Sequence, residues 1–215
     1  PGGMIGYDDG EALYTAINGG EVVEVKISAG SFMEQTEVGN LIASFSSRGP
    51  NGSTGDVIKP DITAPGVRIL AATSDTIFQG VQGETNAYLS GTSMSSPHIA
   101  GMAALLKQEH PNWTPAQIKS ALMTTARQNL TKQEDEGVAA DPFDFGAGHA
   151  VPATARAPGL TYNATYDDYL GFLCGLGEDE TVLDESTFTC EQVAESISTD
   201  PSQLNYPSIA IGELD

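Results

Sequence analysis

Basic residues are scarce in this chain of 215 residues. Nine Lys and Arg side chains stand against 29 Asp and Glu, for a formal net charge of −20 at pH 7. Nucleic acids and anionic membrane surfaces bind through clustered Lys and Arg, so this balance argues against both partners. A solvated acidic surface accounts for the charge. Calcium is the functional alternative, but no Asp-x-Asp-x-Asp-Gly loop supports it, and no metal or other cofactor is expected.

Long apolar runs are also absent. No stretch approaches the roughly 20 apolar residues that a membrane span needs, so no membrane-spanning helix is predicted. No basic, apolar leader with a cleavage signal follows Pro1, and the chain is therefore expected to be an internal or processed piece of a longer one. The apolar share of 40%, with 24 Gly and 12 Pro, is typical of a loop-rich globular protein.

Cysteine is limited to Cys174 and Cys190. The two do not form a Cys-x-x-Cys pair, so zinc binding or redox chemistry has little support. A disulfide between them would stabilise the fold by about 3 kcal/mol and would imply an oxidising compartment. Two free thiols are the alternative that the residues leave open.

Turn signals and periodicity predict a set of short elements. A helix is expected from about Asp9 to Asn18, because Gly19 and Gly20 follow it. The remaining expectations are strands at 21–28, 41–47 and 67–73, extended turns at 141–163 and a short helix at 165–177.

Two longer helices are the clearest local predictions. Over 93–109 the apolar residues recur at helical spacing, and Pro97 falls near the first turn, where a missing N–H costs least. A second helix is predicted from its start signals. Thr114 is a natural N-cap, Pro115 takes the first helical position, and Gln117 completes a capping box.

Ser93 stands at the entry of the first of these helices, in the stretch GTSMSSPHIAG (residues 91–101). The N–H groups at that end lack intrahelical partners and favour developing negative charge. A nucleophilic serine there could stabilise an oxyanion with its own N–H. An ordinary N-cap is the alternative, and the local pattern alone favours it, because serine is a preferred cap.

A serine nucleophile also needs a base, and none of the three histidines is an obvious one. His98 is rotated about 140° from Ser93 and lies ~7.5 Å further along the helix axis, so we expect it to pack with the helix. His110 lies at the helix end before a proline, and His149 lies in a glycine-rich turn. For neither does the sequence show a recognisable Asp or Glu that would orient the ring as a catalytic base.

GTSMSSPHIAGMAALL resembles the serine-bearing segment of the subtilases, the subtilisin-like serine proteases. The pattern of that segment is Gly-Thr-Ser-Met-(Ala/Ser)-x-Pro-His-(Val/Ile)-(Ala/Ser)-Gly. IASFSSRGPN, KPDITAPGVRILAA and HPNWTPAQIKSALMTTA are similar to other segments of the family. DPFDFGAGHAVPATARAPGLTY, FLCGLG and LNYPSI resemble its plant-type branch and the bacterial relatives of that branch.

The resemblance implies an α/β fold, namely part of a subtilisin-like parallel sheet with flanking helices. It also implies four segments along the chain. They are the tail of an inserted protease-associated (PA) domain at 1–30, the C-terminal half of the catalytic domain at 31–160, a linker carrying the cysteine pair at 161–203, and the first strand of a fibronectin-III-like β-sandwich at 204–215.

The resemblance also assigns roles at the site. Ser93 corresponds to the acyl-enzyme nucleophile, and its N–H would supply half of the oxyanion hole. The neighbouring residues that would support this site are Gly91, Thr92 and Met94. Pro97 and His98, further along the helix, would have structural roles.

The family's other catalytic groups have no counterpart in the sequence. No His-Gly-x-His or Asp-Ser/Thr-Gly segment carries the histidine and aspartate, and no segment supplies the oxyanion-hole asparagine. The resemblance therefore implies a secreted serine endopeptidase acting on proteins or peptides, with Asp, His and Asn supplied by the N-terminal half of the same protease. Alone, these residues are expected to be inactive or nearly so. A non-catalytic binding or assembly module and one half of a split protease are the alternatives.

Overall fold

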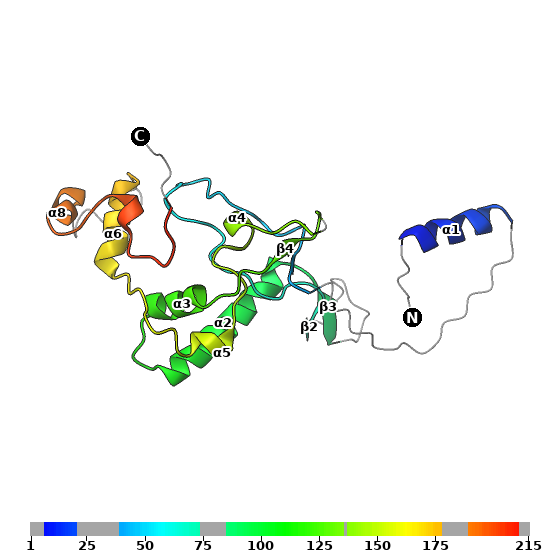
Figure 1. Ribbon diagram of the computed structural model, residues 1–215, viewed down its shortest axis with the longest axis horizontal. Helices are drawn as coiled ribbons and strands as arrows, with labels where there is room; N and C mark the ends of the chain where they lie inside the picture. Colours follow the sequence, from blue (N-terminus) through cyan, green and yellow to red (C-terminus); the bar gives the residue numbers. More distant parts are fainter. Residues whose placement is uncertain (1–6, 21–38, 74–84, 136, 178–188, 211–215) are drawn as a thin grey trace. The chain divides into compact units, whose positions relative to one another are not determined.

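The computed structural model describes residues 7–20, 39–73, 85–135, 137–177 and 189–210. The chain divides into two units, 1–39 and 40–215 (Figure 1). The first unit contains helix α1 (Tyr7–Asn18), which ends at the residue that the following glycines predict. The strand predicted at 21–28 lies outside the described residues.

The second unit mixes short strands with helices of very different length (Figure 1). Its strands are β1 (Leu41–Ile42), β2 (Ile69–Ala72), β3 (Asn86–Leu89) and β4 (Thr131–Lys132). Its helices are α2 (Thr92–Glu109), α3 (Pro115–Thr124), α4 (Pro142–Phe145), α5 (Pro152–Ala155), α6 (Tyr166–Gly175), α8 (Cys190–Ala194) and the 3-10 helix η2 (Pro201–Gln203).

The described strands form two ladders. β1 pairs with β4 in parallel, and β2 pairs with β3 in antiparallel register. The strand predicted at 41–47 is too long, because the Ser46 N–H donates to the Ala43 carbonyl at 2.9 Å and turns the chain after two ladder residues. Among the described residues, this short parallel ladder is what corresponds to the parallel sheet that the resemblance implies.

The helices α2 and α3 follow their local signals. The predicted capping box of α3 is present, with the Gln117 N–H donating to Thr114 Oγ1 at 3.2 Å and Gln117 Oε1 accepting from the Thr114 N–H at 3.0 Å. In α2, however, Pro97 is the sixth residue and not part of the first turn. Its missing N–H therefore leaves the Ser93 carbonyl without the usual intrahelical donor.

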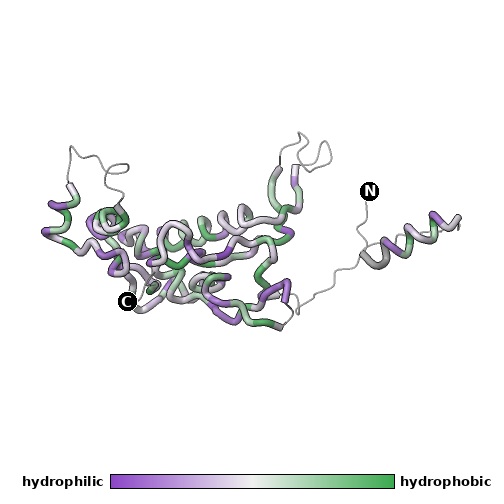
Figure 2. Tube along the Cα trace, turned by 90° about the horizontal axis from the view of Figure 1, so that it is seen from above, coloured by the Kyte–Doolittle hydropathy of each residue, from purple (hydrophilic) through white to green (hydrophobic). Residues whose placement is uncertain are grey.

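Among the described residues of the second unit, apolar side chains gather in three buried clusters. The clusters are Leu106 with Ile118, Leu122 and Ala155; Ile42 with Leu130 and Phe145; and Val57 with Met123 and Tyr206. Figure 2 shows how these apolar residues are interspersed with polar ones along the chain. Ile62 packs against both the first and the third cluster, so the segment that carries it lies at the centre of the core.

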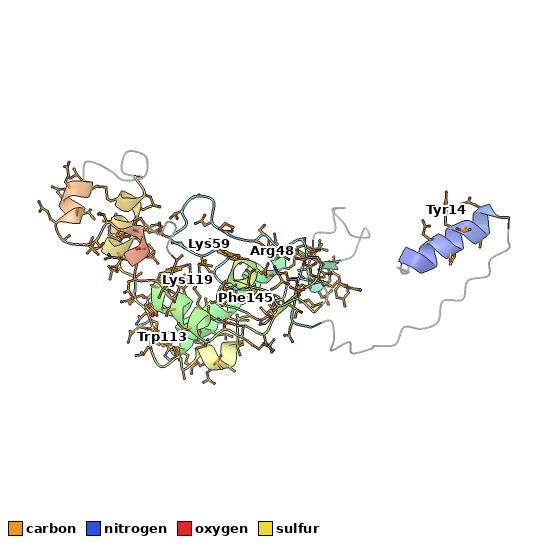
Figure 3. All side chains as sticks on the ribbon, turned by 45° about the horizontal axis from the view of Figure 1, so that its top comes forward. Tyr14, Arg48, Lys59, Trp113, Lys119 and Phe145 are labelled. Carbon is orange, nitrogen blue, oxygen red and sulfur yellow. A yellow bond between two sulfur atoms is a disulfide. The ribbon has the colours of Figure 1, made fainter. Side chains whose placement is uncertain are left out.

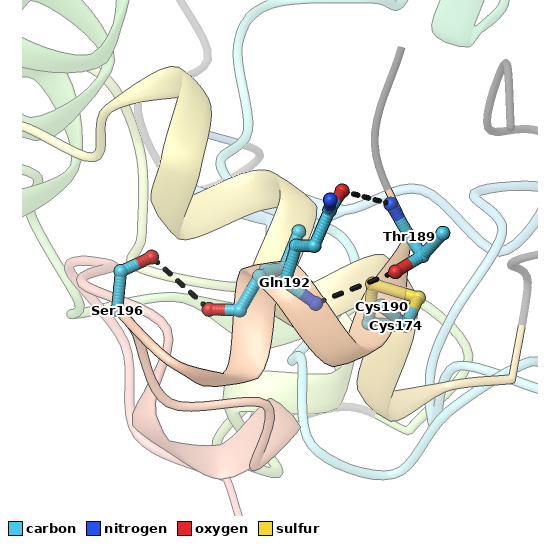
Figure 4. The surroundings of a disulfide bond; sticks show 6 residues. Cys174, Thr189, Cys190, Gln192 and Ser196 are labelled. Atoms are coloured by element: carbon cyan, nitrogen blue, oxygen red, sulfur yellow. Dashed lines mark hydrogen bonds between the residues drawn. A yellow bond between two sulfur atoms is a disulfide. The ribbon is translucent and has the colours of Figure 1, made fainter. Parts of the chain in front are cut away.

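In the segment predicted as a linker, the described residues 161–177 and 189–203 contain α6, α8 and η2. Cys174 at the end of α6 is bonded to Cys190 at the start of α8 (Figure 4). A capping box begins α8, with Thr189 Oγ1 accepting from the Gln192 N–H at 3.4 Å.

The residues after this segment belong to the same core. The described part of the predicted sandwich strand, 204–210, forms no strand. Leu204 and Tyr206 instead pack in the third cluster, beside Val57 and Met123. The β-sandwich at 204–215 therefore stays a prediction.

A buried carboxylate stabilises the turn at α4. Asp144 is only 2% exposed, accepts from the Asp141 N–H at 2.8 Å, and pairs with Arg48 Nε and Lys132 Nζ at 3.1 Å each. Arg48 also pairs with Glu134. Burial alone would raise the pKa of Asp144, but the hydrogen bond from Asp141 and the two cations outweigh burial, so its pKa lies below the usual value.

Asp144→Asn is expected to lower the free energy of unfolding by about 2 kcal/mol at pH 7, because two cations lose their buried partner while the cap acceptor remains. The depressed pKa means that the folded state binds fewer protons, so this stabilisation is complete above about pH 4 and is lost as the pH falls. Urea unfolding at pH 7 and at pH 3 measures both effects. Asp135→Asn, at an exposed acid nearby, is the control. A difference from wild type that persists unchanged at pH 3 would contradict the charge argument.

Replacing both cysteines by alanine is expected to lower the free energy of unfolding by about 3 kcal/mol, since the cross-link restricts the unfolded chain. Denaturant unfolding of wild type and of the Cys174→Ala/Cys190→Ala variant, without reductant, measures the difference. Equal stability of the two proteins would show that the bond contributes nothing.

Candidate functional site

Ser93 is exposed at the second position of α2. The residue at the N-cap is Gly91, in extended backbone, and no side chain caps the helix. The capping role that the local pattern favours for Ser93 is therefore wrong. Its hydroxyl is not used to satisfy the N–H groups of its own helix, and it remains available for other partners.

The first turn of α2 leaves backbone donors at the same place. The first four N–H groups of an α-helix have no intrahelical acceptor. One of them, from Met94, is satisfied by the Gly91 carbonyl at 3.0 Å. The Ser93 N–H and hydroxyl thus lie together at the positive end of the helix dipole, where negative charge is stabilised. Thr92 beside them is exposed, and Met94 is half-buried.

The segment 61–66 fixes the position of this turn. Ser95 Oγ donates to the Ala64 carbonyl at 3.0 Å, and the Gly91 N–H donates to the Gly66 carbonyl at 2.8 Å. The backbones are so close that a Cβ on Gly66 would lie 2.3 Å from Ser95 Oγ and 2.9 Å from the Gly91 oxygen. Only glycine fits here. Neither Gly66 nor Ser95 was predicted as a site residue, although the run Ala-Pro-Gly at 64–66 is a turn signal.

The hairpin of β2 and β3 leads directly into the site. The Arg68 N–H donates to Ser90 Oγ at 2.8 Å, which ties the start of β2 to the residue before Gly91. Leu70 and Tyr88 on this hairpin are exposed, at 59% and 63%. An apolar surface therefore precedes Ser93 along the chain.

Each of the three histidines is engaged elsewhere. His98 Nδ1 donates to the Met94 carbonyl at 2.8 Å. His110 Nε2 donates to the Arg156 carbonyl, and His149 Nδ1 donates to the Ala150 carbonyl, both at 2.9 Å. His98 is therefore bound to its own helix, and His110 also stacks on Trp113. Among the described residues, Ser93 has no imidazole partner.

Metal ligands do not gather in the described part of the chain. No group of three or more His, Cys, Asp or Glu side chains is arranged there to hold a metal ion. Within the same residues, no helix is both long enough and apolar enough to cross a membrane.

An apolar groove of about 520 Å³ runs between α2 and α3. Ile99 and Ala103 line it from α2, and Ile118 and Leu122 line it from α3. Trp113 and Lys119 also line the groove, and both are labelled in Figure 3. The groove leaves apolar side chains of the serine-bearing helix uncovered.

Asp61 and Lys119, which both line this groove, belong to a charged cluster. Its two lysines, Lys59 and Lys119, are labelled in Figure 3. The Asp61 carboxylate is 2.9 Å from Lys59 Nζ and 3.0 Å from Lys119 Nζ, and it accepts a hydrogen bond from the Tyr206 hydroxyl. Burial raises the pKa of Asp61, but these three donors lower it more, so its pKa is below the usual value. Burial and the nearby carboxylate raise the pKa of Tyr206.

Comparison with known proteins gives the same family as the sequence motifs. The model of the Subtilase family (Peptidase_S8) matches residues 14–148. The chain is 40% identical over 227 residues to the subtilisin-like protease SBT5.4 of Arabidopsis thaliana, covering all of this chain and 28% of that protein. It is 44% identical over 189 residues to SBT1.7 of the same plant, covering 80% of this chain and 24% of that protein.

Among solved structures, the chain is similar to fervidolysin from Fervidobacterium pennivorans, a keratinolytic enzyme related to subtilisin. The identity is 33% over 43% of this chain and 14% of that one, and the TM-score of 0.33 is too low to carry an argument. The chain spans about a quarter of the length of the curated relatives it matches. The family match, however, covers more than half of this chain and includes the segment that carries Ser93. This chain therefore belongs to the subtilases, the family of subtilisin-like serine proteases.

Proposed function

We propose that Ser93 is the acyl-enzyme nucleophile of a serine endopeptidase that hydrolyses peptide bonds. One observation carries the proposal: Ser93 is exposed and uncapped at the N-terminus of α2, in a turn that Gly66 and Ser95 hold in place. A hydroxyl is a weak nucleophile by itself, so the geometry serves catalysis only when a base removes its proton during attack.

The chemistry follows from that position. Ser93 Oγ attacks the scissile carbonyl as a base takes its proton, and the carbonyl oxygen becomes an oxyanion. The Ser93 N–H donates to this oxyanion at the positive end of α2. Return of the proton to the leaving amine breaks the C–N bond and leaves the acyl-enzyme, which water then hydrolyses. Gly91 and Thr92 shape the turn that aims these groups, and Met94 packs beside it.

The remaining catalytic groups come from the N-terminal half of the same protease. That half supplies the histidine base, the aspartate that orients it, and an asparagine as the second oxyanion donor. The apolar groove between α2 and α3 supports this proposal, because a parallel sheet needs helices packed on both faces and helices of this kind need a sheet to cover them. The PA-domain tail at 1–30 and the sandwich strand at 204–215 belong to the same proposal.

Protein and peptide substrates in a secretory setting fit these features. The bond between Cys174 and Cys190 supports an oxidising compartment, and therefore a secreted protein. The hairpin surface at Leu70 and Tyr88 offers apolar contact to a polypeptide near Ser93.

A non-catalytic module is the second candidate. It is favoured by one observation, that no histidine among the described residues approaches Ser93. In this case the chain would retain the subtilase fold for binding or assembly. A split protease, with Asp and His on a separate chain, would behave as an enzyme only when both chains are present.

A fluorophosphonate probe applied to the protein expressed from its complete coding sequence is expected to label it once, at Ser93. Ser93→Ala should abolish labelling, because phosphonylation needs the activated hydroxyl. Ser96→Ala, at an exposed serine on the same helix, is the matched control and should label as wild type does. Equal labelling of wild type and Ser93→Ala would refute the assignment. An unlabelled wild type would favour the non-catalytic module.

Gly66→Ala tests the role of the close approach. The added Cβ would overlap Ser95 Oγ and the Gly91 oxygen, so we expect a loss of about 2 kcal/mol in the free energy of unfolding. Displacement of the turn should also slow probe labelling about tenfold. Gly52→Ala, where an added Cβ meets open space, is the control for both measurements. Labelling of Gly66→Ala at the wild-type rate would show that the turn tolerates the displacement.

A further inference from the structure

We propose that Tyr206 is a positioning residue for Ser93, acting through Asp61 and the segment 61–66. The proposal rests on the proposed function of Ser93. It assigns to the LNYPS stretch near the end of the described chain a role in setting the geometry of a turn more than a hundred residues earlier.

The first step is the contact between Tyr206 and Asp61. Tyr206 is 8% exposed, and its hydroxyl donates to Asp61 Oδ1 across 145 residues of sequence. Lys119 Nζ lies 4.6 Å from the centre of the Tyr206 ring and 3.0 Å from Asp61 Oδ2. The ring and hydroxyl of one side chain thus hold both members of an ion pair, so the contact fixes where the carboxylate sits.

The hydroxyl has a distinct task among the donors to Asp61. Lys59 and Lys119 are long, flexible side chains whose ammonium groups can follow the carboxylate if it moves. Tyr206 is rigid and is packed with Val57 and Met123, so its hydroxyl cannot follow. It is therefore the donor that determines the position of Asp61, while the lysines neutralise its charge.

The second step is the stiffness of the segment that follows Asp61. The Ala147 N–H donates to the Asp61 carbonyl at 2.9 Å. The Thr63 N–H donates to Gly148, and the Thr63 carbonyl accepts from Ala150, both at 2.9 Å. Between them, Ile62 is held by two core clusters. A segment bonded at successive residues moves as a unit and does not absorb a displacement locally.

The third step is the contact of this segment with the Ser93 turn. Ala64 and Gly66 accept from Ser95 and Gly91, the residues two positions after and two positions before Ser93. Both contacts are direct hydrogen bonds, and Gly66 packs so closely against Gly91 and Ser95 that an added Cβ would overlap them. A shift of Asp61 is therefore transmitted to both sides of the nucleophile.

The rate constant for phosphonylation of Ser93 by the fluorophosphonate probe, measured on the complete protein, tests this path. Tyr206→Phe keeps the ring, the packing and the contact with Lys119, and removes only the hydroxyl. We expect its rate constant to fall about tenfold, because small displacements of a nucleophile have large kinetic effects, while the labelled fraction at completion stays that of wild type. Tyr162→Phe, at a half-exposed tyrosine outside the cluster, should label at the wild-type rate.

A double-variant comparison shows whether Tyr206 acts through Asp61. Asp61→Ala removes the acceptor of the Tyr206 hydroxyl and should also slow labelling. Adding Tyr206→Phe to it should cause no further loss, because residues on one path are not additive. Additive losses would overturn the path through Asp61.

Two other outcomes overturn the proposal. The first is labelling of Tyr206→Phe at the wild-type rate, which would show that the hydroxyl does not position Ser93. The second is a lower labelled fraction with an unchanged rate constant, which would show that the hydroxyl has a purely structural role. A wild-type protein that is not labelled at all would overturn the proposed function of Ser93 and this inference with it. That result is distinguishable from the other two, in which the wild-type protein is labelled.

Discussion

The close approach of segment 61–66 to the N-terminus of α2 is the constraint on which the site depends. Gly66 lies against Gly91 and Ser95 with no room for a side chain. Two hydrogen bonds join the segment to this turn, one from the Gly91 N–H and one from Ser95 Oγ. These contacts set the extended backbone at the N-cap, so α2 begins at Thr92 and Ser93 falls inside its first turn. An exposed hydroxyl beside unsatisfied N–H groups is the direct consequence.

The same constraint connects the site to the core. Ile62 packs against two of the buried clusters, and Asp61 accepts a hydrogen bond from Tyr206 near the far end of the described chain. The serine turn is therefore supported by packing that extends from α3 to the segment after η2. The groove between α2 and α3 leaves part of this packing uncovered.

Local signals predicted those parts of the fold that local chemistry determines. The start of α3 is determined within four residues, by Thr114, Pro115 and Gln117. The motif around Ser93 identified the family. The N-cap expectation for Ser93 failed because the backbone at Gly91 is set by a tertiary contact with Gly66. The contact between Asp61 and Tyr206 spans 145 residues, and no periodicity or turn signal carries information over that distance. The pairing of the two cysteines was left open because their sequence context does not distinguish a disulfide from two free thiols.

The proposed function requires that Ser93 forms the acyl-enzyme. To detect that intermediate, the complete protein is mixed with a slowly hydrolysed ester and quenched in acid within the burst phase, and the acyl group is mapped by peptide mass spectrometry. We expect one acyl group, carried by Ser93 and absent after full turnover. An acyl group on another residue, or ester hydrolysis with no acylated serine, would contradict the proposed function.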